Sequence, residues 1–78
     1  MIKKENKLII TFHTTIEAMM MESVCKENKK SGRLIPVPGS ISAGCGFAWC
    51  ASLEQEEDLR KLMLETGINA QEILSCLI

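Results

Sequence analysis

The first hydrophobic run of the chain covers residues 7–12 and, after Lys7, consists of apolar and β-branched residues without clear alternation. Such a run is typical of a strand in the middle of a sheet. Thr14 then stands three residues before Glu17, the spacing of a capping box at a helix start. Apolar residues recur at helical spacing beyond it, at Ala18, Met21, Val24 and Cys25. The pattern predicts a strand and then a helix with one buried face, which ends at Ser31-Gly32.

The middle of the chain alternates between extended and irregular segments. Residues 33–38 are extended but contain two prolines, which cannot donate ladder hydrogen bonds, so we expect an edge strand there. Residues 39–44 are small and have no periodicity, which indicates a loop. Residues 46–51 alternate again, with the two aromatic side chains on one face and Cys50 on the other. They predict a third strand.

The C-terminal part repeats the helix signals. Ser52 stands three residues before Gln55 in a second capping box, and acidic residues follow in the first turn. A buried side is expected at Leu59, Leu62, Met63 and Thr66, and Gly67 suits a left-handed C-terminal cap. Residues 73–78 predict a last strand, although a short helix beginning at residue 70 is an alternative.

The expected order is therefore strand, helix, strand, strand, helix, strand. This order matches the α+β, ferredoxin-like split β-α-β (βαββαβ) arrangement, in which two right-handed crossovers place both helices on one face of an antiparallel sheet. With 78 residues there is room for one thin core only, so we expect a single domain, residues 1–78, with its core at about 7–78.

Composition excludes several classes of partner. Nine Lys+Arg against ten Asp+Glu give a net charge of −1, which provides no electrostatic basis for binding nucleic acid or an anionic membrane. The apolar run near the N-terminus is too short for a signal peptide or a membrane span. We therefore expect a cytoplasmic protein.

The four cysteines are expected to be free thiols, because the cytoplasm keeps thiols reduced. Their spacing lacks the paired Cys-x-x-Cys pattern of zinc sites, so neither a metal nor a cofactor is predicted. Cys25 and Cys76 lie in apolar segments, where a thiol behaves as a small hydrophobic side chain. Burial in such surroundings suppresses thiol chemistry.

Cys45 differs from these, because it stands between Gly44 and Gly46 outside any apolar periodicity. It closes the predicted loop that includes Ser42. Flanking glycines leave room for a partner's sulfur and let backbone amides turn toward a thiolate. A nucleophilic or carrier thiol needs such access, so Cys45 is the candidate reactive residue. The alternative is a turn cysteine without function.

Two other residues bear on this site. His13 precedes the first helix and would approach the loop if the first and third strands are neighbours, although a solvated loop histidine is the alternative. Cys50 is an odd number of residues beyond Cys45, so the two side chains point to opposite faces of an extended chain. Cys50 can act as a resolving thiol only if the loop folds back.

Four segments together resemble a known family: residues 10–14, 17–22, 33–38 and 41–46. They are similar to the Se/S carrier-like proteins, small bacterial proteins whose domain also occurs fused behind a sulfur-relay carrier domain. The resemblance covers about residues 7–66. Its most specific part runs from Pro36-Val37-Pro38 to Cys45-Gly46.

The resemblance implies that selenium or sulfur travels on Cys45 as a persulfide or selenosulfide, in a carrier rather than an enzyme. The partners would be a donor such as a cysteine desulfurase and an acceptor enzyme. Gly39 stands where the family usually has an arginine. Stabilisation of a thiolate or persulfide would then come from backbone amides, Arg33 or a partner.

Two other functions stay open. The first is a thiol redox-sensing module that uses Cys45 with Cys50. The second is a non-catalytic interaction domain, including a homodimer, in which Phe47, Trp49 and the proline-containing strand form the contact surface.

Overall fold

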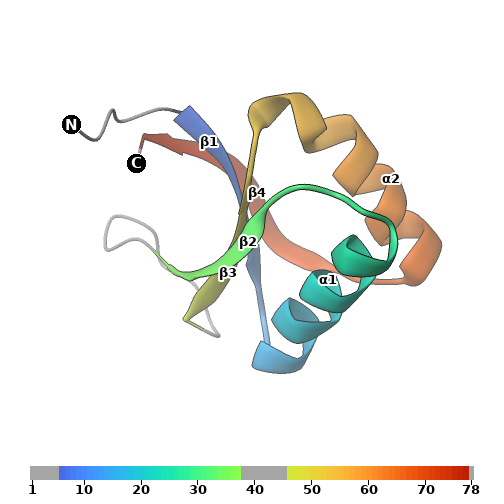
Figure 1. Ribbon diagram of the computed structural model, residues 1–78. Helices are drawn as coiled ribbons and strands as arrows, with labels where there is room; N and C mark the ends of the chain where they lie inside the picture. The colour runs from blue at the N-terminus through green and yellow to red at the C-terminus, as the bar shows by residue number, and fades with distance from the viewer. Residues whose placement is uncertain (1–5, 38–45, 78) are drawn as a thin grey trace.

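The computed structural model describes residues 6–37 and 46–77. These residues form the following elements in chain order (Figure 1): β1 Asn6–Phe12, α1 Thr15–Glu27, β2 Arg33–Pro36, β3 Phe47–Ala51, the 3₁₀ turn η1 Leu53–Gln55, α2 Glu56–Thr66 and β4 Ala70–Leu77. Neither helix has the length and apolar character that crossing a membrane requires, as far as these residues go.

The four strands form one antiparallel sheet in the order β2-β3-β1-β4. Both helices lie on the same face of this sheet (Figure 1). This is the ferredoxin-like split β-α-β arrangement, and the predicted fold class is confirmed. The proline-containing strand β2 lies at one edge, as expected, and among the described strands it pairs with β3 alone. An edge position suits prolines, because they cannot donate a ladder hydrogen bond.

The main core lies between the sheet and the helices. Alternate residues of β1 point into it, because successive side chains of a strand face opposite sides. The two helices contribute the residues spaced for one face: Ala18, Met21 and Cys25 from α1, and Leu59, Leu62 and Met63 from α2. Thr66, expected in this set, is exposed, and its hydroxyl donates to the Leu62 carbonyl at 2.8 Å.

A second, smaller cluster occupies the helix-free face of the sheet. Ile9, Ala48 and Cys50 are buried there. Apolar side chains from the edge strands, and from the residue just after β2, pack against them: Ile35, Val37, Leu74 and Cys76. The central strand β1 is thus covered by apolar side chains on both faces, which explains why its sequence does not alternate.

The first helix begins as predicted and ends earlier than predicted. The Glu17 amide donates to the Thr14 hydroxyl at 3.3 Å, and that hydroxyl donates to the Glu17 carboxylate at 3.2 Å. Helix α1 stops at Glu27. Lys29 follows with a φ of +55°, the left-handed conformation that a glycine usually adopts after a helix. Ser31-Gly32 is therefore not the helix terminus.

Gly32 is required for a different reason. Its φ is +127°, and a Cβ built on it would lie 2.6 Å from the Trp49 indole Nε1 and 2.8 Å from the Cys50 carbonyl oxygen. Real side chains do not make contacts this short. The glycine lets the start of β2 lie directly against the Trp49 ring.

The second helix begins through a short turn. The Ser52 side chain makes no capping hydrogen bond, and the Gln55 amide donates to the Ser52 carbonyl at 3.0 Å to close η1. The predicted capping box at Ser52 is therefore absent. The helix ends as predicted, because Gly67 has a φ of +78° and its amide donates to Met63 at 2.9 Å. The chain then forms β4 rather than a short helix.

Candidate functional site

The candidate reactive residue, Cys45, lies outside the described residues, as do Ser42, Gly44 and Gly39. Their predicted roles stay predictions. The structure describes the two positions from which this connection leaves β2 and returns to β3. The Val37 amide donates to the Gly46 carbonyl at 2.9 Å, which extends the β2–β3 ladder by one residue pair.

Gly46 itself is exposed and has a φ of +80°. No described atom lies within 4 Å of a Cβ built on it, apart from its neighbours in the chain. A left-handed conformation is favourable for glycine and costly for most other residues. The residue that follows Cys45 is therefore a glycine for conformational reasons, and none of the described residues fills the space beside its Cα.

His13 lies at the same end of the sheet as Gly46. Thr11 pairs with Ala48 in the antiparallel β1–β3 ladder, so the end of β1 and the start of β3 coincide. His13 comes two residues after Thr11 and is exposed. The prediction that the first and third strands are adjacent is confirmed. This pairing places His13 at the end of the sheet where the chain enters β3.

Arg33 and Cys50 lie elsewhere. The two residues are direct partners in the β2–β3 ladder, and both side chains are on the helix-free face. Cys50 is three strand residues beyond Phe47, about 10 Å along β3. Arg33 is therefore placed beside Cys50 and not beside Gly46.

The same spacing bears on a disulfide between Cys45 and Cys50. A disulfide brings its two Cα atoms within about 7 Å. Because β3 already begins at Phe47 and is paired on both sides, its first residues would have to leave the sheet for Cys50 to approach the connection.

The remaining thiols differ in their surroundings. Cys25 is fully buried between α1 and the sheet, as predicted, and this burial raises the pKa of its thiol to about 11, while the positive charge of Lys30 acts in the opposite direction. Cys76 is half-buried on the helix-free face, so it is not part of the main core. Among the residues the structure describes, no three His, Cys, Asp or Glu side chains are grouped closely enough to hold a metal ion.

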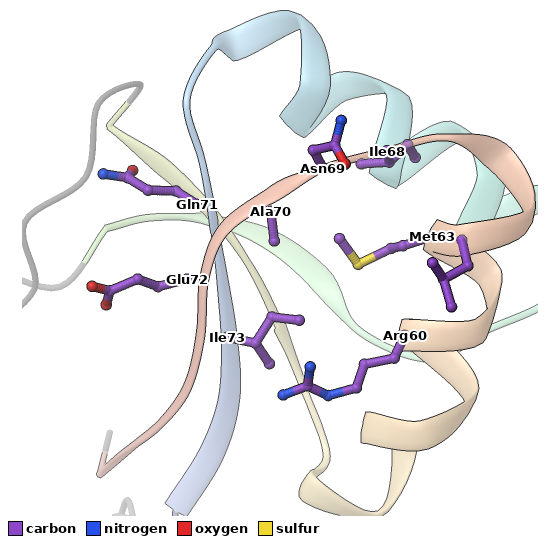
Figure 2. A pocket seen from close by; sticks show the side chains of 9 residues that line it. Arg60, Met63, Ile68, Asn69, Ala70, Gln71, Glu72 and Ile73 are labelled. Atoms are coloured by element: carbon purple, nitrogen blue, oxygen red, sulfur yellow. The ribbon is translucent and has the colours of Figure 1, made fainter.

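One cavity of about 450 Å³ lies between α2 and β4, at the sheet edge opposite β2 (Figure 2). Met63, Ala70 and Ile73 surround it, and the Arg60 side chain extends toward Ile73, whereas Gln71 and Glu72 point to the other side of the strand (Figure 2). Among the residues that the structure describes, no cysteine or histidine lines it. These described lining residues therefore offer no group for thiol chemistry.

The end of the sheet near Gly46 carries exposed apolar side chains. Phe47 is 41% exposed, and the first turns of α1, which follow β1 directly, expose Ile16, Met19 and Met20. Trp49 is only 3% exposed. The expectation that Trp49 contributes to a contact surface is therefore wrong, because its ring fills the core beside Gly32.

The fold and these residues define a class of protein, a small ferredoxin-like α+β domain with thiols outside its main core. The chain belongs to the family described as "Putative Se/S carrier protein-like", whose family model matches residues 7–75. No curated protein and no solved structure matches the chain.

Proposed function

We propose that this domain carries sulfur or selenium on Cys45. The thiolate accepts a sulfur or selenium atom from a donor enzyme and holds it as a persulfide or selenosulfide. An acceptor enzyme then removes it. The domain itself serves as a carrier and does not turn over a substrate.

The observation that carries this proposal is membership of the Se/S carrier-like family over residues 7–75, a range that includes Cys45. Two features of the chain agree with it. Cys45 is flanked by glycines in the sequence, and no described atom outside its chain neighbours lies within 4 Å of a Cβ built on Gly46, the described one of the pair. A carrier thiol needs such access, because its sulfur must be reached in line by the thiols of two different proteins.

The chemistry of each transfer is a thiol–persulfide exchange. The Cys45 thiolate attacks the terminal sulfur of a persulfide on the donor, the donor S–S bond breaks, and the donor thiolate leaves. The new persulfide on Cys45 is later attacked at its terminal sulfur by the acceptor thiolate, which regenerates the Cys45 thiolate. Each step exchanges one S–S bond for another, so no external oxidant or reductant is needed.

The described part of the site offers one group for proton transfer. His13 is exposed at the end of the sheet where the chain returns into β3. An imidazole there can take the proton of an incoming thiol or return it to a leaving thiolate. The donor we expect is a cysteine desulfurase, which forms a persulfide on its own cysteine.

The relay can be followed with labelled sulfur. The protein is incubated with a cysteine desulfurase and sulfur-labelled cysteine, separated from both, and its label is then released with a thiol. We expect wild type and Cys50→Ser to take up and release label at Cys45 equally, and Cys45→Ser to take up none at that position from the desulfurase. Equal labelling of Cys45→Ser and wild type would refute the proposal. A Cys45–Cys50 disulfide formed under mild oxidation would instead favour the redox module.

A further inference from the structure

A second cavity, of about 360 Å³, lies on the helix-free side of the sheet where β2 begins and β3 ends. We call it the Cys50 cavity. Six of the described residues line it: Lys7, Ser31, Gly32, Arg33, Cys50 and Ser52. Its position at the Arg33–Cys50 pair places it at the end of β3 away from Gly46, so it is separate from the Cys45 position.

The described lining of this cavity is polar. Two of its side chains are cations, two carry hydroxyl groups and one is a thiol, and none of these described residues is a carboxylate. The Arg33 guanidinium takes part in neither of the two salt bridges between described residues, Lys30–Asp58 and Arg60–Glu56. Its positive charge is therefore not neutralised by a described carboxylate.

The thiol of Cys50 is held in place at the wall of the cavity. The residue is only 7% exposed, is in the reduced form, and sits in the ladder between Arg33 on β2 and Ile9 on β1. Directly opposed residues of an antiparallel pair have Cβ atoms roughly 5 Å apart. Arg33 and Cys50 therefore lie on one side of the sheet and line the same cavity.

The lining of the cavity indicates the charge of its ligand. Positively charged side chains and hydroxyl groups favour an anion. The Cys50 thiol beside them can react with such an anion when it carries a persulfide sulfur, since thiolate–persulfide exchange needs in-line contact with a sulfur atom.

We propose that the Cys50 cavity is a second thiol site, in which Cys50 takes up the terminal sulfur of a small persulfide or polysulfide anion held by Arg33. The choice of cargo rests on the proposed carrier function, and the preference for an anion does not. The Cys50 thiolate attacks the terminal sulfur, the S–S bond of the incoming species breaks, and the shortened sulfide or thiolate leaves. One S–S bond replaces another, so the electrons balance without an oxidant.

The anion preference is tested by alkylation in the Cys45→Ser protein. Iodoacetate is an anion and iodoacetamide is neutral, so the ratio of their rates at one thiol reports the local charge. We expect this ratio at Cys50 to fall roughly fivefold in Arg33→Met, the effect of one partly exposed charge, and to recover in Arg33→Lys. The ratio at Cys76, on the same face, serves as the internal control and should stay unchanged. An unchanged ratio at Cys50 would overturn the proposal.

Uptake of sulfur is tested in the same protein with inorganic polysulfide as the probe, followed by peptide mapping. We expect added sulfur on the Cys50 peptide, reduced by a comparable factor in Arg33→Met. No sulfur on Cys50 would overturn the second site. It would leave the carrier function intact if Cys45 in wild type still accepts sulfur from the desulfurase, so the two failures can be told apart.

Discussion

Individual residues of this domain gain different properties from where the fold places them, and the thiols show this most clearly. Cys25 lies in the main core, where burial raises the pKa of its thiol. Cys50 and Cys76 lie on the helix-free face, where side chains of the sheet and not of the helices surround them. One residue type therefore serves as packing in one place and lines a polar cavity in another.

The raised pKa of Cys25 predicts a pH dependence of stability. Above its ordinary pKa of 9.0 the thiol ionises in the unfolded chain, but it stays protonated in the folded protein up to about pH 11. The unfolded state then binds fewer protons, so the free energy of unfolding falls as the pH rises through this range. Denaturant unfolding across it should show a steeper loss for wild type than for Cys25→Ala. Equal losses would contradict this account.

Gly32 predicts a large effect of adding one methyl group. We expect Gly32→Ala to destabilise the fold by about 2–4 kcal/mol, because the new Cβ would collide with the Trp49 ring in addition to the strain of a positive φ. Gly67→Ala is the matched control. Its φ is also positive but nothing described lies within 4 Å, so the added backbone strain alone should lower the free energy of unfolding, by about 1 kcal/mol. Thermal unfolding of the two variants decides, and equal effects would be inconsistent with the contact.

At the level of elements, the two helix starts have similar sequences but different structures. The Thr14 side chain caps α1, whereas the Ser52 side chain makes no capping bond before α2. We expect Thr14→Ala to reduce the free energy of unfolding by about 1 kcal/mol and Ser52→Ala to change it much less. Chemical denaturation of the two variants measures the difference. A larger loss in Ser52→Ala would show that the predicted capping box exists in solution.

The elements themselves were predictable where local chemistry decides them. Prolines in 33–38 identify an edge strand, and the spacing of Ala18, Met21 and Cys25 identifies a buried helix face. The end of α1 was not predictable, because Lys29 takes the left-handed conformation that a glycine usually takes. The role of Gly32 was not predictable either, since it depends on a close approach to Trp49, which is distant in sequence.

The pairing of Arg33 with Cys50 is a property of the whole sheet. Sequence analysis assigned both residues to the support of Cys45, because it could not fix the register of β2 on β3. That register places them together, and folding also adds Lys7 from β1 to the same cavity. The position of His13 at the end of the sheet near Gly46 was predictable, since the fold class alone makes β1 and β3 neighbours.

The whole molecule also predicts where partners bind. Phe47 follows Gly46 directly and is partly exposed, so an acceptor enzyme that reaches Cys45 should contact it. We expect Phe47→Ser to slow sulfur transfer to the acceptor roughly fivefold through lost apolar contact, with uptake from a small persulfide unchanged. Leu64→Ser, on α2 and 85% exposed, removes apolar surface elsewhere and should have no effect. Transfer rates that fall equally in both variants would argue against docking at this end.

The central claim is that Cys45 holds the transferred atom. It is tested most directly by peptide mapping with mass spectrometry after wild type is loaded with a cysteine desulfurase and cysteine. The account predicts that the peptide containing Cys45 gains the mass of one sulfur atom, that a reducing thiol removes it, and that Cys45→Ser gains nothing at that position. Loading that leaves the Cys45 peptide unmodified would contradict the account.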